Sequence, residues 1–414
     1  MKTIVITSHG TLGDNLPLIA LGQSLQKRGH KVVMVISQPM HPYALRAGLK
    51  VLANGRILGK EEASKEPNCW NHIAENKAVK VVDESFYQKI QSDLPKRLSC
   101  LLDACKDADA IISTPQQNVP AVIARTEFRL PWIKAFVAPI FCCMEKKRNY
   151  KSSSDDLAYH NERMYEILEE TLQAHGMSFF DLVAASERDN ISKHSILGSS
   201  PLFSQLTSKH ASTTQTGFWF YENPEWQSWQ PDNELKAFMA QNPKPLVLSF
   251  SSQPLTEQDA RTVVEVHIRA AAKLNRPILI QQGWADFKAD LLSEDYDRDR
   301  VMFAGFMSQD WLFSNAAALI HHGGIGTTAR ALRNGCPMLV EPYGNDQFFN
   351  AKQIVFHQVG AAVHPINLQV DELVRVLRDK VLTPEYKQRA EAMGAKIRQE
   401  SGLENAVNAI EGWI

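Results

Sequence analysis

The segment from His321 to Thr328 contains the residue types of a phosphate-binding turn. Its sequence, His-His-Gly-Gly-Ile-Gly-Thr-Thr, follows an apolar run that predicts a buried strand from Ala317 to His321. Glycine lets the backbone approach an anion closely, and the free N–H groups at the start of a helix attract it. We therefore expect phosphate contacts from His322, Gly324, Gly326, Thr327 and Thr328. The alternative is a plain strand–glycine–helix turn capped by the threonines.

Two polar residues, Asp346 and Gln347, follow the next predicted strand, Met338 to Glu341. The carboxyl ends of parallel strands meet at one edge of the sheet, where the ligands of doubly wound folds bind. We expect Asp346 and Gln347 to lie beside the phosphate-binding turn, because both segments leave that edge. A carboxylate next to an amide suits paired hydrogen bonds to sugar hydroxyls. Asp346 could also cap the helix that begins at Gln347, and the two roles are compatible.

A third candidate, Asp14, lies in the glycine-containing turn after the first predicted strand, Ile4 to Thr7. A carboxylate in this loop could accept the proton of a hydroxyl that attacks the anomeric carbon of a sugar. Asp14 or Asn15 could instead cap the helix that follows. His9 lies nearby and could be the base or assist it, and a neutral structural histidine is its alternative role.

Alternating strands and helices must position these residues. The chain opens with a strand, a helix with leucines at helical spacing, and a second strand from Lys31 to Ser37. This order predicts a parallel sheet covered by helices. Further strands are expected at Ala110–Ser113, Trp132–Val137, Leu246–Phe250, Ile278–Gln282, Val301–Phe303, Ala317–His321, Met338–Glu341 and Ala361–His364. Helices are expected at Asp156–Ala174, Glu257–Leu274, Gly326–Asn334, Pro384–Gln399 and Glu404–Trp413.

The length of the chain sets the number of domains. A chain of 414 residues exceeds the usual size of one hydrophobic core. We expect an α/β fold of two Rossmann-like, doubly wound domains that face each other across a cleft. The N-terminal domain is expected over residues 1–216, a linker rich in proline and tryptophan over 217–244, and the C-terminal domain over 245–395. A C-terminal helix over 396–414 is expected to cross back to the N-terminal domain.

Composition excludes several classes of function. Lys and Arg number 45 against 46 Asp and Glu, so we expect no basic face for a nucleic acid.

The glycine spacing after His322 matches neither the dinucleotide nor the P-loop pattern. No apolar run approaches the roughly 20 residues that cross a bilayer, so we expect a cytoplasmic protein, with peripheral membrane contact left open. The six cysteines lack metal-ligand spacing and are expected to be reduced, buried thiols.

The sequence resembles the GT-B glycosyltransferases of the bacterial antibiotic and sterol glucosyltransferase type, within the UDP-glycosyltransferase superfamily. The resemblance runs through the whole chain and rests on two anchors. The N-terminal anchor is Gly13-Asp14-Asn15-Leu16-Pro17, with the helix that ends at Arg28-Gly29-His30. The C-terminal anchor runs from Asp310-Trp311-Leu312-Phe313 through His321–Thr328 and Gly335-Cys336-Pro337 to Asp346–Ala351. The segment Thr216–Phe220 also resembles the family's approach to its interdomain linker.

By position, the resemblance assigns a role to each candidate residue. Asp14 matches the family's catalytic base, where many relatives have His, and His9 is the second candidate. Donor binding is implied for Ser252, Gly283, Trp284, Phe306, Met307, Gln309, His322, Gly324, Gly326, Thr327, Thr328, Asp346 and Gln347. Within this set, Phe306 stands where plant enzymes place a Trp that stacks on the base, and a phenylalanine can still stack.

Two departures from the family concern the donor. Arg330 stands where plant members place a Glu that holds the ribose hydroxyls. The ribose must therefore be recognised differently, and the sequence does not distinguish a uracil base from thymine. Ser251 replaces the Gly of the family's Gly-Ser donor loop, which narrows the loop.

The resemblance implies an inverting, metal-independent glycosyltransferase without a cofactor. It would move a hexose, expected to be glucose, from a UDP- or dTDP-sugar to a hydroxyl of a lipophilic small molecule, such as a sterol, a terpenoid, a polyketide or a phenol. Asp14 would deprotonate that hydroxyl, while His322 and the helix start stabilise the departing nucleoside diphosphate. The alternatives are an idle, nucleotide-sugar-binding auxiliary protein and a UDP-sugar epimerase.

The acceptor pocket is expected in the first half of the chain, between Leu58 and Ser200, where the strand–helix pattern weakens. Aromatic side chains there would suit a flat, lipophilic molecule, although each also fits a core position: Phe86, Tyr87, Trp132, Phe136, Phe141, Phe179 and Phe180.

Overall fold

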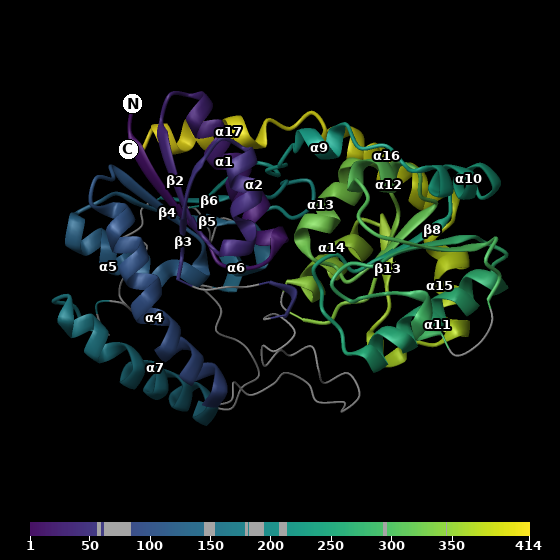
Figure 1. Cartoon of the computed structure of the whole chain (residues 1–414), viewed down its shortest axis with the longest axis horizontal. Helices are drawn as coiled ribbons and strands as arrows, with labels where there is room; N and C mark the ends of the chain where they lie inside the picture. The colour runs from purple at the N-terminus through teal and green to yellow at the C-terminus, as the bar shows by residue number, and fades with distance from the viewer. Residues whose placement is uncertain are drawn as a thin grey trace. The chain divides into compact units, whose positions relative to one another are not determined.

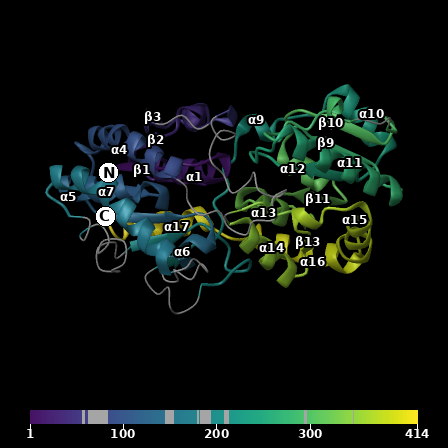
Figure 2. The same ribbon diagram turned by 90° about the horizontal axis from the view of Figure 1, so that it is seen from below.

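The computed structural model describes residues 1–55, 59–61, 84–144, 154–178, 181, 194–206, 213–292, 296–344 and 346–414. These residues form two compact units. Unit 1 comprises the described residues of Met1–Gly59, Ala78–Tyr221 and Ser401–Ile414, and unit 2 those of Lys60–Lys77 and Glu222–Glu400. Figures 1 and 2 show both units from two directions. Each unit contains one parallel sheet and the helices that cover it.

The sheet of unit 1 has the strand order β3-β2-β1-β4-β5-β6-β7, and every neighbouring pair is parallel. Its strands are β1 (Thr3–Thr7), β2 (Lys31–Ile36), β3 (Lys50–Ala53), β4 (Ala110–Ser113), β5 (Trp132–Phe136), β6 (His194–Leu197) and β7 (Thr213–Gln215). The central strands are apolar and buried on both faces, as a sheet between helices requires. The chain reverses its direction of travel across the sheet between β1 and β4, which makes this pair a topological switch point.

The helices of unit 1 connect these strands and include the end of the chain. They are α1 (Leu12–Lys27), α2 (His41–Arg46), α4 (Glu84–Cys105), α5 (Asn118–Phe128), α6 (Pro139–Met144), α7 (Ser154–Ala174) and α17 (Gly402–Glu411). Helix α17 packs along α1 (Figure 1). Glu411 of α17 forms an ion pair there: its carboxylate accepts from Arg28 at 2.6 Å and contacts the His30 ring at 3.1 Å.

The sheet of unit 2 has the order β10-β9-β8-β11-β12-β13 and is also fully parallel. Its strands are β8 (Leu246–Ser249), β9 (Ile278–Gln281), β10 (Val301–Ala304), β11 (Ala318–His321), β12 (Met338–Val340) and β13 (Gly360–Ala362). With β8 counted as the first strand, this is the Rossmann order 3-2-1-4-5-6. The switch point lies between β8 and β11.

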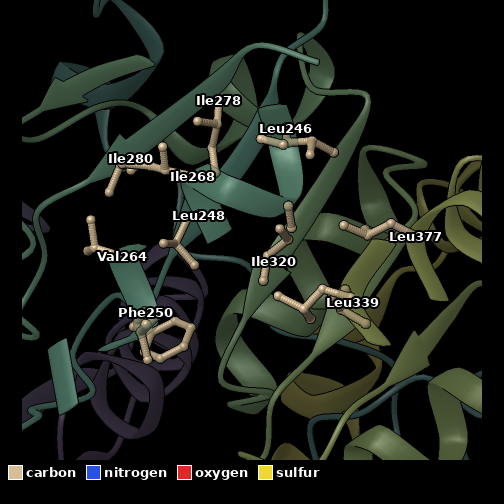
Figure 3. Packing of buried hydrophobic residues seen from close by; sticks show 14 of the residues in the cluster. Leu246, Leu248, Phe250, Val264, Ile268, Ile278, Ile280, Ile320, Leu339 and Leu377 are labelled. Carbon is tan, nitrogen blue, oxygen red and sulfur yellow. The ribbon is translucent and has the colours of Figure 1, made fainter. Parts of the chain in front are cut away.

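The helices of unit 2 are α9 (Pro224–Gln227), α10 (Asn233–Gln241), α11 (Glu257–Lys273), α12 (Gln309–Ser314), α13 (Ile325–Arg333), α14 (Gln347–Phe356), α15 (Val370–Val376) and α16 (Pro384–Ile397). Val264 and Ile268 of α11 pack onto the strands in one apolar cluster (Figure 3). The same cluster includes Ile280, Ile320 and Leu339 from three different strands. Helix α11 therefore covers one face of the sheet and fixes the strand ends that lead into the loops.

The predicted α/β fold with two Rossmann-like sheets is confirmed, and every predicted strand is found with its ends shifted by at most two residues. The sequence pattern missed β3, β6 and β7, which are edge strands or lie next to one. It also missed α4, α5 and α10, and α10 lies within the stretch expected as an irregular linker. Asp232 caps α10 by accepting from Leu235 N at 2.8 Å, a signal that the surrounding prolines and tryptophans concealed.

The expectation of buried thiols is confirmed for three described cysteines and is wrong for Cys100 of α4, which is partly exposed. Cys105, Cys142 and Cys336 are buried free cysteines, and burial raises the pKa of Cys105 and of Cys336 to about 12. Cys69 lies outside the described residues, as does the side chain of Cys143. Within the described ranges, no helix is both long and apolar enough to span a bilayer.

Candidate functional site

The predicted phosphate-binding segment lies at the switch point of unit 2. Strands β8 and β11 are neighbours. From β8 the chain continues to β9 and β10 toward one edge of the sheet, and from β11 it continues to β12 and β13 toward the other edge. Doubly wound sheets bind ligands in the crevice that this reversal leaves at the carboxyl ends of the strands. His321 ends β11 at that edge, and the Phe250 ring, just after β8, contacts the His322 ring with 6.2 Å between centroids.

Two glycines shape the turn between β11 and α13. Gly323 has a φ of +92°, and a Cβ at this position would lie 2.6 Å from a methyl carbon of Val340. Gly324 caps α13, and a Cβ there would lie 2.4 Å from Nε2 of His322. Gly324 and Gly326 remain partly exposed, so a ligand can reach the backbone N–H groups of the first helical turn. These groups have no partner within their own helix.

The two threonines that follow lie deeper than the glycines. Thr327 is 6% exposed and Thr328 is fully buried. The Thr328 hydroxyl lies 3.5 Å from the carbonyl oxygen of Gly323, so it faces the turn itself. The backbone of this turn is therefore more accessible to an anion than the Thr328 side chain.

Both histidines are buried and neutral. The Gly323 N–H donates to Nδ1 of His321 at 3.1 Å, which leaves the His321 proton on Nε2. Burial holds the pKa of His321 well below its usual value, and the neighbouring His322 lowers it further. Burial also lowers the pKa of His322 to about 4. At neutral pH, His322 can therefore donate one hydrogen bond to a ligand but carries no charge.

Asp346 contacts the start of α13. The Ile325 N–H donates to Oδ2 of Asp346 at 3.2 Å, and the Asn350 amide donates to the same oxygen at 2.7 Å. Burial raises the pKa of Asp346 to about 6, against the lowering effect of these two hydrogen bonds. The structure thus places Asp346 next to the predicted phosphate-binding turn, as the strand order predicted. Sequence reasoning missed Asn350, although its i+4 spacing from Asp346 along one helix is a usable signal.

Gln347 holds its own turn. Its Oε1 accepts from the N–H groups of Tyr343 and Gly344 at 2.8 and 3.2 Å, and its amide group donates to Gln253 at 3.1 Å. Gln347 is 4% exposed. The side chain expected to bind a sugar therefore fixes the turn that precedes α14 and ties it to the loop after β8. Gln253 was not foreseen, because its partner lies 94 positions away.

The loops after β8 and β9 meet through left-handed residues. Ser251 has a φ of +49° and Gly283 a φ of +53°. The Trp284 N–H donates to the Ser251 carbonyl at 2.7 Å, and a Cβ on Gly283 would approach the same oxygen to 2.7 Å. Ser251, expected at the Gly position of the donor loop, thus adopts a left-handed conformation that favours glycine. Ser252 and Trp284 lie partly exposed beside this contact.

The segment after β10 presents one exposed aromatic ring. Phe306 is 60% exposed, and its ring lies 5.9 Å from that of Trp226. Met307 is 1% exposed and belongs to the core, so its side chain is not at the surface. Gln309 is the first residue of α12. Of the three predicted residues in this segment, Phe306 therefore offers the surface on which a base could stack.

Arg330 is engaged within the protein. Its guanidinium donates to Asp310 at 2.6 Å and lies over the Trp226 ring at 5.9 Å. The Asn334 amide donates to the other oxygen of Asp310 at 2.8 Å. Arg330 is 7% exposed, so this network fastens α13 to α12. The sequence flagged Arg330 as a departure, but its partners Asp310 and Trp226 were not predicted.

In unit 1, His9 and Asp14 follow β1 at the switch point between β1 and β4. His9 is buried at 8% exposure, and Asp14 lies in the first turn of α1. The Asp14 carboxylate accepts from the N–H of Thr11 at 3.0 Å, and Thr11 forms the reciprocal bond of a capping box. Asp14 therefore has the helix-capping role that the sequence offered as its alternative. Asn15 is buried and donates to the carbonyl oxygens of Gly10 and Thr11, both at 2.9 Å.

Two of the aromatic residues predicted for the acceptor pocket can be placed, and the side chains of the other five lie outside the described residues. Trp132 and Phe136 are 3% and 1% exposed on β5, so they are core residues. Phe179 and Phe180 lie outside the described residues, as do the side chains of Phe86, Tyr87 and Phe141. Among the described residues, no three His, Cys, Asp or Glu side chains converge in a way that could hold a metal ion.

Comparison with known proteins supports the resemblance. The family model for the C-terminal domain of erythromycin biosynthesis protein CIII-like proteins matches residues 296–405. The chain is 24% identical to a sterol 3-beta-glucosyltransferase of Debaryomyces hansenii, over 97% of this chain and 26% of that protein. It is also 24% identical to the O-mycaminosyltylonolide 6-deoxyallosyltransferase of Streptomyces fradiae, over 99% of this chain and 97% of that protein. The chain spans only about a quarter to a third of the sterol glucosyltransferases it matches.

Solved structures agree on the fold. The glycotransferase of kitacinnamycin matches with a TM-score of 0.72 at 18% identity, over 100% of this chain and 99% of that one. The glycosyltransferase VinC, solved in complex with dTDP, matches with a TM-score of 0.70 at 16% identity, over 99% of this chain and 98% of that one. The predicted GT-B fold and the predicted resemblance to sterol and antibiotic glycosyltransferases are confirmed, and the relatives' names agree with the predicted enzyme class.

Proposed function

We propose, from this kinship with sterol and antibiotic glycosyltransferases, that the protein is an inverting glycosyltransferase. It takes a hexose from a UDP- or dTDP-sugar and joins it to a hydroxyl of a lipophilic small molecule. The observation that carries the proposal is the meeting of His322, the first turn of α13 and Asp346 at the switch point of unit 2. The start of α13, which can bind an anion, and the Asp346 carboxylate, which can accept from sugar hydroxyls, lie side by side there.

The helix start acts on the leaving group. The diphosphate gains negative charge as its bond to the sugar breaks, and the backbone N–H groups around Gly326 offer fixed donors with the positive end of the helix behind them. His322 adds one neutral donor. Because the pKa of His322 is about 4, this hydrogen bond does not depend on protonation near neutral pH. The positive helix end takes the part that a divalent cation plays elsewhere, so the reaction needs no metal.

Asp346 acts on the sugar. A carboxylate can accept at about four lone-pair sites, and Ile325 and Asn350 occupy two. The remaining capacity suits sugar hydroxyls next to the diphosphate. Asn350 and Gln347 hold this carboxylate and its turn in place rather than competing for the ligand.

Asp14 is proposed as the base that activates the acceptor. An ordinary carboxylate, with a pKa of about 3.9, is weak toward an alcohol, so proton transfer accompanies formation of the new C–O bond. Attack on the face opposite the diphosphate inverts the anomeric carbon without a covalent enzyme intermediate. The capping bond from Thr11 fixes one Asp14 oxygen and orients the other.

The nucleotide base is proposed to stack on Phe306. Phe306 follows β10, and its exposed ring lies beside the ring of Trp226. The two rings provide an aromatic surface. Two of the structural neighbours were solved with thymidine diphosphate bound, which favours testing a dTDP-sugar as well as a UDP-sugar. The Arg330 guanidinium already donates to Asp310, so contacts to the ribose must come from other groups.

A product assay tests the proposal. The protein is incubated with UDP-glucose or dTDP-glucose and with a sterol, a macrolide or a phenol, and the mixture is analysed by mass spectrometry. A product heavier than its acceptor by one hexosyl group is expected, with a β-linkage from an α-linked donor. Nucleoside diphosphate release or sugar isomerisation without an acceptor product would instead identify an epimerase-type reaction. Donor binding without any turnover would identify an auxiliary binding protein.

A further inference from the structure

One charged pair lies inside the apolar core of unit 2. His267 of α11 and Glu341, which follows β12, are both fully buried, with 2.7 Å between Nε2 of His267 and Oε1 of Glu341. Val264 and Ile268, on the same helix as His267, and Leu339, two residues before Glu341, belong to the apolar cluster drawn in Figure 3. The reaction proposed above uses neither His267 nor Glu341.

The hydrogen bonds of the pair fix its protons. Nδ1 of His267 lies 2.6 Å from the Val263 carbonyl, which can only accept, so Nδ1 carries a proton. Although burial lowers the pKa of His267, the charge and hydrogen bond of Glu341 raise it above its usual value on balance. With Nδ1 protonated, the 2.7 Å contact of Nε2 with Oε1 requires one further proton between His267 and Glu341, so the pair as a whole is neutral. The pair therefore adds no net negative charge beneath the proposed diphosphate site.

Stability does not account for the pair. Burying two charges costs more hydration than their attraction usually returns, and apolar replacements of similar volume are often neutral or stabilising. The other carboxylate oxygen of Glu341 is also buried, without a hydrogen-bond partner among the described residues. A leucine at this buried position would leave no such unpaired oxygen. The free energy of folding therefore gives no clear reason to keep the pair.

The position of Glu341 shows what it can control. Its N–H donates to the carbonyl oxygen of His321 at 2.9 Å, so it is joined to the strand that delivers His322. It is also the first residue after β12, and Tyr343, two residues on, packs its ring on Phe250 with 5.5 Å between centroids. Gln347 closes the same turn at its other end. Glu341 thus anchors the start of the segment that carries Asp346.

We propose that His267 and Glu341 are positioning residues, which tie the segment between β12 and α14 to helix α11 and so hold Asp346 at the start of α13. This inference rests on the proposed function, because it assigns Asp346 to the donor sugar. It concerns the sugar and not the nucleoside diphosphate, since the phosphate-binding turn belongs to β11 and α13. Loss of the pair should therefore reduce sugar transfer more than diphosphate binding.

The test compares four variants with the wild type. Glu341→Gln keeps a hydrogen bond, because its amide can donate to a neutral His267 that still donates to Val263. Glu341→Leu removes the bond, and the double variant His267→Leu with Glu341→Leu also removes the unpaired partner. Ile268→Ala is the matched control, since it opens the same core one residue from His267 without touching the pair. The unfolding midpoint, the Kd for UDP or dTDP and the kcat/KM for transfer are measured for each.

We expect the double leucine variant to keep its unfolding midpoint and its affinity for the nucleoside diphosphate, while kcat/KM for transfer falls by about tenfold or more. Glu341→Gln should retain transfer within about threefold, because the link persists. Ile268→Ala should lower the midpoint but leave kcat/KM unchanged at 25 °C. Transfer at the wild-type rate in the double leucine variant would overturn the positioning role.

Two further outcomes are distinguishable. If the leucine pair does not fold, methionine at both positions fills the same space more flexibly and carries the same expectation. Failure of both pairs to fold would make the charged pair a requirement of the fold and overturn the inference. If the wild type itself neither binds a nucleoside diphosphate nor transfers a sugar, the proposed function fails instead.

Discussion

At the scale of single residues, the site depends on how burial adjusts two side chains. Burial keeps His322 neutral and raises the pKa of Asp346 to about 6. The neutral histidine can therefore donate a hydrogen bond to a ligand at any physiological pH. The Asp346 carboxylate, in contrast, changes its charge near pH 6, just below the physiological range. The pH dependence of the reaction should follow Asp346.

The substitution Asp346→Asn tests this assignment. In the wild type, the ionised carboxylate that accepts from sugar hydroxyls is lost as pH falls through about 6, so kcat/KM for the donor should fall there. Asn keeps an oxygen for Ile325 and Asn350, and kcat/KM should drop by about 10- to 100-fold at pH 8 with the acidic limb removed. Stability has the opposite sign: because the pKa of Asp346 is raised on folding, ionisation of this carboxylate lowers the free energy of unfolding as pH rises from about 4 to 6. An unchanged pH profile in Asp346→Asn would assign the acidic limb to another group.

The substitution Asp14→Asn separates the two roles of Asp14. The amide oxygen can still accept from Thr11, so α1 should keep its cap and the unfolding midpoint should change little. An amide cannot accept the acceptor's proton, so transfer should be abolished while the Kd for the nucleoside diphosphate stays the same. Full activity in this variant would exclude Asp14 as the base, and His9→Ala would then be measured.

At the scale of elements, the contact between the loops after β8 and β9 places Ser251 in a left-handed conformation, which lowers the stability of the fold. A left-handed non-glycine residue costs roughly 1 kcal/mol or more, and Ser251 has a φ of +49°. Ser251→Gly should therefore raise the free energy of unfolding by about 0.5 kcal/mol, after the greater freedom of glycine in the unfolded chain is counted. Gly283→Ala should lower it by more than about 1 kcal/mol, because its Cβ would press on the Ser251 carbonyl. Denaturant titration measures both, and Gly305→Ala, where a Cβ meets open space, is the neutral control.

Much of the arrangement of strands and helices could be predicted from the sequence. Apolar runs of four to six residues between glycines and helical spacings are the signature of buried parallel strands, so the central strands were found. The missed strands are short or polar: β7 reads Thr-Thr-Gln and β3 begins with an exposed Lys50. The site segments were predicted because both follow strands that end at one edge. Contacts between distant residues, such as that of Ile325 with Asp346 or of Gln253 with Gln347, leave no periodic pattern and needed the structure.

At the scale of the whole molecule, the chain returns at its end to the unit in which it began. Helix α17 is joined to α1 by the ion pair of Arg28 with Glu411 and by buried apolar residues that include Ile410. The ion pair is more than a quarter exposed on both sides, so water and salt weaken it. The apolar contacts should therefore hold α17 in place.

The two contributions to this attachment can be measured separately. Ile410→Ala should lower the free energy of unfolding of unit 1 by about 2–4 kcal/mol, because it leaves a cavity at a fully buried position. Glu411→Ala should lower it by less than about 1 kcal/mol. Denaturant titration at low and high salt checks both values, and the Glu411 effect should shrink in high salt. A larger loss from Glu411→Ala than from Ile410→Ala would show that the ion pair, and not burial, fastens the helix.

The central claim is that the start of α13 binds the diphosphate of a nucleotide sugar. A crystal structure of the protein with UDP or dTDP tests it most directly. We predict phosphate oxygens within about 3 Å of the backbone N–H groups of Gly326 and Thr327, with a ring nitrogen of His322 on the same phosphate. A nucleotide bound with its phosphates away from α13, or at the β1–β4 switch point of unit 1, would contradict the account.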